Sequence, residues 1–485
     1  MVVKKIKHPS IDERRAMGLD ARDRTPVSDQ EHWRPATDRP DPVALLQEQD
    51  ATREPDLVPV RHGRMMASPF TFYRGAANIM AADLAETPVS GLDAQLCGDA
   101  HLSNFGAYAS PDRRLLFDVN DFDETLPGPF EYDVKRMAAS FMIAARNNGF
   151  TNVDSIGATR ASVTGYREAM ADFAQMGMMD VWYAYMDEDK LLSGIRGAVG
   201  EIGETAKGKK GKKQLKVAKA AEAKARKNLG QARTRGSLQA LSKLGELVDG
   251  KYQIISQPPI VVPLRDWTGS NGLSADEVAD MIRAQFRAYR ATLQDDRRHL
   301  LERFEVVDVA RKVVGVGSVG TRAFIVLLQG RDAQDPLFLQ IKEATASVLE
   351  AHLGKSRYRQ HGERVVQGQR MMQAASDIYL GWTKGQDVRR GYYWRQLRDM
   401  KASALVETMA PVALTYYGRI CGWTLARAHA RSGDPVAIAA YLGDSDAFDK
   451  SITDFAKRYA KQNERDYDEF VGAIKSGRLE ALEGV

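Results

Sequence analysis

Apolar and polar residues alternate along this chain with two different periods. A helical period runs through residues 133–148, which end at Gly149, and through residues 411–430 and 446–482. The run SADE at 274–277 is typical of a capping box that begins a helix, and Ile282, Phe286 and Tyr289 fall on one face of that helix. Runs rich in Val, Ile and Phe predict strands at 304–328, 336–343, 377–382 and 392–397. We therefore expect an α+β fold.

The order of these segments predicts four regions. Residues 1–60 are polar, with scattered Asp and Pro, and predict a loosely structured arm with one short helix near 43–49. Residues 61–302 predict a large helical lobe, which contains a lysine-rich insertion at 207–227 that we expect to be solvated. Residues 303–400 predict a small β-rich nucleotide lobe, and residues 401–485 predict helices that complete the large lobe.

Composition adds little to this picture but excludes some classes of protein. The 485 residues are 44% hydrophobic and 27% charged, as in ordinary soluble proteins. The net charge of +5 is too small to indicate nucleic acid binding by itself. Two cysteines, Cys97 and Cys421, imply no disulfide framework. Because no secretory signal and no run near 18 apolar residues is present, we expect a cytoplasmic protein without membrane contact.

A glycine-rich turn and a strand lysine indicate a phosphate site. The run GVGSVG supplies Gly315, Val316, Gly317, Ser318 and Gly320, whose backbone N–H groups can approach phosphate oxygens closely. A strand pattern follows the turn, whereas a dinucleotide-binding turn is followed by a helix. A plain hairpin is the alternative.

The lysine of this site would be Lys342, at the end of the next strand, FLQIK, where protein kinases place the lysine that pairs with the α- and β-phosphates of ATP. Its carboxylate partner would be Glu350 or Glu363, and the sequence does not decide between them.

Acidic residues near the front of the chain indicate the chemical end of the same site. Phosphoryl transfer needs a carboxylate near the attacking hydroxyl and oxygen ligands for Mg²⁺. Asp99 and Asn104 in GDAHLSN fit these roles, and Asp121 adds an anionic metal ligand, with Asp123 as a second one. We interpret His101 as a residue that braces the loop. The eight histidines form no cluster of the kind that a metallophosphoesterase needs.

These motifs resemble those of aminoglycoside and choline phosphotransferase-like kinases. GDAHLSN is similar to their catalytic loop HGDxxxxN, with Cys97 in place of the histidine, and NDFDETLPGPFEYD is similar to their metal loop. The resemblance implies that Asp99 is the catalytic base, that Asn104 and Asp121 bind the metal, and that Asp133 braces the catalytic loop. Runs such as SPFTFYRG and CGWTLARAHARSGD also resemble a bacterial family called domain of unknown function 2252.

The order of the motifs is unusual, because the glycine turn follows the catalytic loop. Joining the end of the helix at 411–430 to Gln95 would restore the kinase order, so we expect a circularly permuted, two-lobed kinase-like fold. The predicted function is transfer of phosphate from Mg-ATP to a small-molecule or protein hydroxyl. The alternatives are a non-catalytic nucleotide-binding scaffold and, less favoured, nucleic acid binding through residues 207–227. Nothing in the sequence indicates the acceptor or the oligomeric state.

Overall fold

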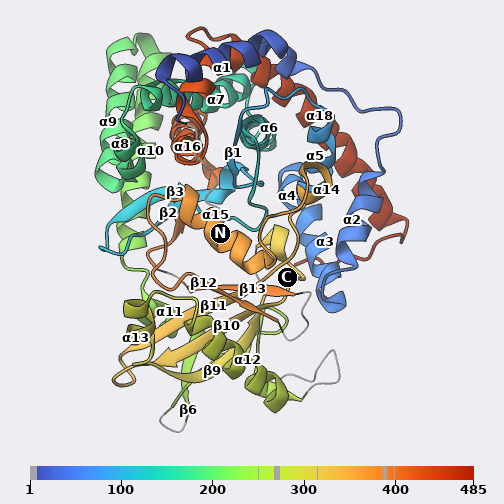
Figure 1. Ribbon diagram of the computed structural model, residues 1–485, viewed down its shortest axis with the longest axis vertical. Coiled ribbons are helices and arrows are strands. Elements are labelled where there is room, and N and C mark those ends of the chain that lie inside the picture. Colours follow the sequence, from blue (N-terminus) through green and yellow to red (C-terminus); the bar gives the residue numbers. More distant parts are fainter. Residues whose placement is uncertain are drawn as a thin grey trace.

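The computed structural model describes residues 8–248, 251–266, 274–313, 315–385, 390–397 and 399–484. It is a mixed α+β fold with 57% helix and 15% strand, as predicted. Helices gather at one end and the largest sheet lies at the other (Figure 1). No helix among the described residues is long and apolar enough to cross a membrane.

The helices up to the lysine-rich segment are α1 (Ile11–Arg24), α2 (Pro42–Asp50), α3 (Val58–Met66), α4 (Pro69–Gly75), α5 (Ala77–Ala85), α6 (Phe130–Asn147), α7 (Asn152–Ala174), α8 (Met178–Tyr183), α9 (Glu188–Thr205) and α10 (Gly208–Arg233). The later helices are α11 (Ser237–Leu244), α12 (Ala275–Arg290), α13 (Asp295–Leu301), α14 (Glu350–Leu353), α15 (His361–Met372), α16 (Pro411–Ala430), α17 (Pro435–Leu442) and α18 (Ala447–Lys475). Short 3₁₀ turns are η1 (Val27–Glu31), η2 (Pro55–Leu57), η3 (Leu102–Asn104), η4 (Leu264–Asp266), η5 (Val316–Ser318) and η6 (Val406–Thr408).

The strands are β1 (Asp93–Leu96), β2 (Phe105–Ala109), β3 (Leu115–Val119), β4 (Leu126–Pro129), β5 (Met186–Asp187), β6 (Gly245–Val248), β7 (Lys251–Ile254), β8 (Val261–Pro263), β9 (Glu305–Lys312), β10 (Ala323–Gln329), β11 (Pro336–Ala344), β12 (Gly381–Lys384), β13 (Gly391–Gln396) and β14 (Ala402–Ser403). The largest sheet has the order β12-β13-β11-β10-β9-β8 and is antiparallel throughout. A second sheet, β14-β2-β3-β5, lies within the helical part, and β1 pairs with β4.

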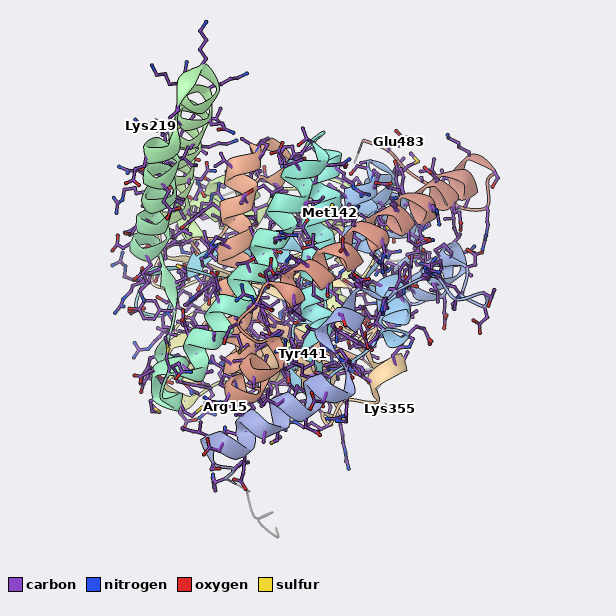
Figure 2. All side chains as sticks on the ribbon, turned by 90° about the horizontal axis from the view of Figure 1, so that it is seen from above. Arg15, Met142, Lys219, Lys355, Tyr441 and Glu483 are labelled. Atoms are coloured by element: carbon purple, nitrogen blue, oxygen red, sulfur yellow. The ribbon has the colours of Figure 1, made fainter. Side chains whose placement is uncertain are left out.

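The helical part is built around α6, which is buried along almost its whole length. Its neighbours α7, α16 and α18 pack around it, and their side chains share one large hydrophobic core. Seen from above, these helices form a continuous layer in which Met142 of α6 lies between neighbours (Figure 2). This core holds the front half and the tail of the chain together.

The β-rich part begins earlier in the chain than expected. The predicted boundary at residue 303 assigned α12 to the helical lobe, but its apolar face packs on the large sheet instead. Tyr289 stacks on Trp394 of β13 with ring centroids 4.6 Å apart, and Ile282 and Phe286 belong to the same cluster. Ala240 and Leu244 of α11 belong to a second cluster with Ile325 and other residues of that sheet. An amphipathic helix is buried by whichever apolar surface lies nearest, and the sequence pattern does not identify that surface.

The first 60 residues are also more ordered than expected, over the described part from residue 8. The short helix predicted at 43–49 is α2, but α1, η1 and η2 were not predicted. Helix α1 has no broad apolar stripe. It packs on α17 through small residues, Gly18 and Ala21, and a Cβ at Gly18 would lie 2.1 Å from the carbonyl oxygen of Ala437. The expectation of a loose arm was therefore wrong.

The lysine-rich insertion is a helix rather than an irregular segment. Residues 207–227 fall almost entirely in α10, which pairs with α9 as an antiparallel hairpin on the flank of the helical part (Figure 1). Its lysines are mostly exposed, as expected from their mutual repulsion.

Candidate active site

Lys342 brings the two halves of the predicted site together. Its side chain is only 3% exposed, and its Nζ lies 2.5 Å from Oδ2 of Asp123 and 3.8 Å from Oδ1 of Asp121. Strand register explains the position, because Lys342 of β11 pairs with Tyr393 of β13, and the Tyr393 hydroxyl donates to Oδ1 of Asp123 at 2.6 Å. We call residues 120–125, which carry Asp121 and Asp123, the acidic loop. Lys342 and Asp123 of this loop are 219 residues apart in sequence, yet they face each other within one chain.

The two aspartates of the acidic loop have opposite electrostatic properties. Burial opposes ionisation of Asp123, but Lys342 and the Tyr393 hydroxyl outweigh it and lower the pKa of Asp123 to about 2. Burial, together with the charge of Asp123, raises the pKa of Asp121. Oδ1 of Asp121 is buried without a hydrogen-bond partner. A buried carboxylate oxygen of this kind is suited to a cation.

The glycine turn lies against the same loop. Ser318 of η5 donates a hydrogen bond from Oγ to Oδ2 of Asp123 at 3.2 Å. Gly315 stands just before η5, and a Cβ there would meet no atom within 4 Å. Val316, on the other side, packs against the hydrophobic cluster that contains Phe72. The turn therefore presents its serine to the acidic loop, and the space around Gly315 is open.

The N-terminal region holds this turn in place. Arg53 donates from Nη2 to the carbonyl oxygen of Gly317 at 3.0 Å and from Nη1 to that of Val319. The backbone N–H of Glu54 donates to the carbonyl oxygen of Gly320 at 2.7 Å. Gly320 has φ +88°, and a Cβ there would lie 2.9 Å from Arg53 Cβ, so this position requires glycine.

Asp99 is held by an arginine that the sequence analysis did not single out. Arg136 of α6 donates from Nε to Oδ1 of Asp99 at 2.8 Å, and its Nη2 lies 2.7 Å from the same oxygen in an ion pair. Burial raises the pKa of Asp99, while Arg136 and Arg74 act in the opposite direction. One carboxylate oxygen is thereby fixed, and Oδ2 faces His101, whose Nε2 is 3.7 Å away.

His101 has the surroundings of a neutral imidazole. Burial and the nearby Arg74 and Arg136 hold its pKa well below the usual value. Its Nδ1 is buried without a hydrogen-bond partner. The loop is braced through the backbone of His101, whose N–H donates to Asp99 O and whose carbonyl accepts from Asn104 N, both at 2.8 Å.

Asp133 of α6 binds the backbone at the start of the GDAHLSN loop. Its carboxylate accepts hydrogen bonds from the N–H groups of Cys97 at 2.8 Å and Gly98 at 3.0 Å, and His429 Nε2 lies 3.2 Å away. Gly98 has φ +82°, and a Cβ there would lie 2.2 Å from Glu124 O. The start of the catalytic loop is thus fixed to α6 by two backbone hydrogen bonds to one buried carboxylate.

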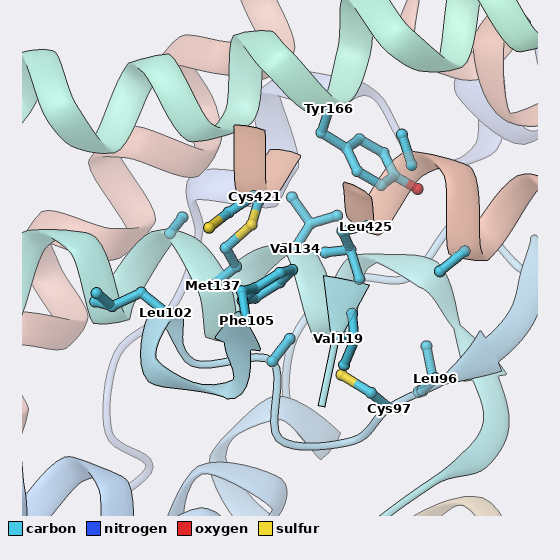
Figure 3. Packing of buried hydrophobic residues seen from close by; sticks show 14 of the residues in the cluster. Leu96, Cys97, Leu102, Phe105, Val119, Val134, Met137, Tyr166, Cys421 and Leu425 are labelled. Carbon is cyan, nitrogen blue, oxygen red and sulfur yellow. The ribbon is translucent and has the colours of Figure 1, made fainter. Parts of the chain in front are cut away.

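Apolar residues anchor the rest of that loop. Cys97, Leu102 and Phe105 are fully buried in the core beside Met137 of α6 and Leu425 of α16 (Figure 3). Cys97 therefore behaves as a small apolar group, and burial raises the pKa of its thiol well above the usual value.

Asn104 connects the catalytic loop to the acidic loop. Its side-chain amide donates to Asp99 O at 2.8 Å, and its own carbonyl accepts from Asn120 N at 2.8 Å. The backbone of Asn104 is therefore joined to the segment that carries Asp121.

Neither glutamate considered as a partner for Lys342 reaches it. Glu350 of α14 lies 3.7 Å from Arg364 and 3.6 Å from His361. Glu363 is on α15, the helix that carries both of these residues. Within the described ranges, the carboxylates at ion-pair distance from Lys342 are Asp121 and Asp123.

Helix α15 contributes an arginine instead. Arg364 donates to Asp123 O at 2.7 Å and to Thr125 O at 2.6 Å, which fixes the backbone of the acidic loop.

Some of the missed residues had a detectable signal. Arg136 follows Asp133 by three positions on a helix, so both face the same side and reach the same loop. The contacts of Arg53 and Arg364 join segments more than 200 residues apart, and local sequence patterns carry no information about such pairs.

The donor set fits a magnesium ion that is shared with phosphates. Over the described residues, no three His, Cys, Asp or Glu side chains are grouped so that they could hold a metal by themselves. Mg²⁺, however, is usually bound through one or two carboxylates together with substrate phosphates and water. Asp121, with its unpartnered oxygen, Asp123 and the side-chain oxygen of Asn104 offer such a set.

Comparison with known proteins gives a family. Searches against curated proteins and against solved structures found no match. The sequence model of one family, described as "Uncharacterized protein conserved in bacteria (DUF2252)", matches residues 53–473. Because that match covers most of the chain, including both loops and the glycine turn, the chain belongs to the DUF2252 family.

Proposed function

We propose that the protein is a Mg-ATP-dependent phosphotransferase with a two-lobed, kinase-like and circularly permuted fold. The observation that carries this proposal is that the strand lysine and the glycine turn both contact Asp123, a carboxylate of the acidic loop. Asp123 accepts from Lys342 at 2.5 Å and from Ser318 of the glycine turn at 3.2 Å, and it belongs to the acidic loop itself. A phosphate site needs glycine N–H groups, a lysine and an acidic metal ligand within reach of each other.

The permuted order is supported by the neighbours of β1. The N–H of Gln95 donates to Ser432 Oγ at 3.0 Å, just after the end of α16. A Cβ on Gly433 would lie 2.9 Å from Asp93 O, so the two chain segments are in direct contact. Linking them there would give the order of glycine turn, lysine, helix α16, catalytic loop and acidic loop.

Each residue has a role that follows from its surroundings. The backbone of the glycine turn and Lys342 would hold the phosphates of ATP. Asn104, Asp121 and Asp123 would hold Mg²⁺, which when bound would neutralise phosphate charge. Arg136 fixes Oδ1 of Asp99, so Oδ2, which lies 3.7 Å from His101 Nε2, would be the oxygen that accepts the hydroxyl proton.

The transfer is a displacement at the γ-phosphorus. The acceptor oxygen forms a bond to this phosphorus while the bond to the β–γ bridging oxygen breaks, and ADP leaves with that electron pair. The hydroxyl proton passes to Asp99, which is positioned as the general base.

The test is the Asp121→Asn variant, assayed for Mg-dependent release or transfer of the γ-phosphate. We expect turnover to fall by at least about 100-fold, since the substitution removes a metal ligand, while the folded state survives. Asp454→Asn, at an exposed position of α18, is the matched control and should leave turnover unchanged.

Unchanged turnover in the Asp121 variant would contradict the metal assignment. ATP binding without any transfer or release, autophosphorylation included, would instead support the non-catalytic scaffold.

A further inference from the structure

A partly open cavity lies on the flank of the helical part. Its volume is about 360 Å³, and it is lined by α9, α10, α16, β14 and the strands β2 and β3. Protein interiors contain few voids larger than a water molecule, and an apolar cavity of about 150 Å³ already holds benzene. A space of this size is that of a ligand site.

Small residues on one helix create the space. Ala218, Ala221 and Ala225 recur at helical spacing on α10 and line the cavity, opposite Val412 of α16 and Ile195 of α9. The alanines leave the volume between the helices unfilled by the protein.

The interior of the cavity is lined mainly by apolar side chains. Two tyrosines of α16 line it, but the Tyr417 hydroxyl donates to Leu102 O at 2.8 Å and the Tyr416 hydroxyl to Leu191 O at 3.3 Å. Both hydroxyls are therefore already satisfied. The surrounding side chains, such as Val199 and Met409, select an apolar ligand.

The edge of the cavity carries one lysine and one glutamate, on a helix whose other charges are mostly positive. Lys224 belongs to the cavity wall, and its Nζ donates to Thr408 Oγ1 at 2.8 Å. The acid on this wall, Glu222, is paired with Arg226 at 3.1 Å. Residues 207–227 contain nine lysines, one arginine and one acidic residue, and the hairpin that carries them projects past the neighbouring helices (Figure 2).

From the apolar interior and the lysine at the edge, we propose that this cavity binds a long-chain fatty acid. The hydrocarbon chain would lie between α10 and α16, and the carboxylate would lie near Lys224. Burial of the chain provides the affinity, and the lysines favour an anionic head group over a neutral one. The proposal does not depend on the phosphotransferase function, because it uses none of the residues around Lys342 and Asp123.

The experiment is a fluorescence titration of the full-length protein with cis-parinaric acid. We expect saturable binding of one molecule per chain, competed by palmitate more strongly than by hexadecanol. The double variant Ala221→Leu/Ala225→Leu fills the cavity and should weaken binding at least tenfold. Ala223→Leu, on the exposed side of the same helix, is the control and should bind as the wild type does.

Two further variants make the outcome decisive. Val412→Phe fills the cavity from the opposite wall, so it gives the same test if the double variant melts at a lower temperature than the wild type. Lys224→Gln should reduce the preference for palmitate over hexadecanol, while Lys227→Gln, outside the cavity wall, should not. The absence of saturable binding, or binding that the filled variants retain, would overturn the proposal.

Discussion

Replacing Lys342 by methionine tests the contact on which the proposed site depends. Methionine keeps most of the length of the buried side chain and removes only the ammonium group that lies 2.5 Å from Asp123. The pKa of Asp123 is held at about 2 against an ordinary value of 3.8. A tenfold change in proton affinity corresponds to about 1.4 kcal/mol, so the net effect of the surroundings favours the ionised form of this carboxylate by about 2 kcal/mol. Burial opposes ionisation, and Lys342, followed by Tyr393 and Arg395, outweighs it.

The contribution of ionised Asp123 to the free energy of unfolding should depend on pH in one predictable direction. The pKa of Asp123 is lower in the folded protein than in the unfolded chain, so the stabilisation is complete above pH 4 and is lost as the pH falls through about 2. A double-mutant cycle of Lys342→Met and Asp123→Asn should give a coupling energy of about 2 kcal/mol at pH 7. The cycle is needed because Lys342→Met alone also removes the cost of burying a charge.

The assay is urea unfolding of the four proteins at pH 7 and at pH 3, where the coupling should fall to roughly half. Lys384→Met, at an exposed strand end of the same sheet, is the matched control and should change stability by less than about 0.5 kcal/mol. Lys342→Met should also weaken ATP binding by about 10- to 150-fold, the value of one charged hydrogen bond. A coupling energy below about 0.5 kcal/mol would refute the reasoning.

Two other substitutions test the loops around this pair. Burial raises the pKa of Glu124 to about 7, against the hydrogen bond from Val348 N, so its contribution to stability is present below pH 4.5 and is lost as the pH rises through 7. In urea unfolding, the stability of Glu124→Gln relative to the wild type should therefore rise by about 2 kcal/mol between pH 5 and pH 8. If the free energies of unfolding of the two proteins changed in parallel with pH, this prediction would be wrong. Asp133→Asn should cost about 2–4 kcal/mol in the same assay, because an amide cannot accept both the Cys97 and Gly98 N–H bonds as the carboxylate does. A loss below about 0.5 kcal/mol would show that the two bonds do not hold the loop.

Local sequence patterns correctly predicted several helices and strands whose boundaries depend on their own residues. The helix predicted at 411–430 is α16 with the same bounds, and the capping box at Ser274 begins α12 as expected. The strand predicted at 336–343 is β11, one residue longer. Helix α1 was missed because its buried contacts are made by Gly18 and Ala21, and small residues do not produce an apolar stripe.

The site was predictable in its residue types but not in its pairings. The motifs marked Asp99, Asp121, Asp123 and Lys342, and the structure brings the last three together. The partner of Lys342 was expected to be Glu350 or Glu363, of which Glu350 lies on α14 and Glu363 on α15. Here that helix presents Arg364, which binds the backbone of the acidic loop.

This difference in partner has a consequence for nucleotide binding. In the proposed function, the phosphates of ATP would have to replace or share Asp123 as the partner of Lys342, so an interaction of about 2 kcal/mol would oppose binding of ATP without metal. When Mg²⁺ is present, Asp123 has a second cation to bind and this cost is offset.

Asp123→Asn should therefore act in opposite directions on the two forms of the ligand. It should strengthen binding of metal-free ATP by about tenfold, since Lys342 is no longer engaged by a carboxylate, and it should weaken binding of Mg-ATP. Calorimetric titrations in EDTA and in excess Mg²⁺ measure both affinities on the same protein. If the substitution weakened both forms equally, Asp123 would be acting only as a structural support, and the metal role assigned to it would be wrong.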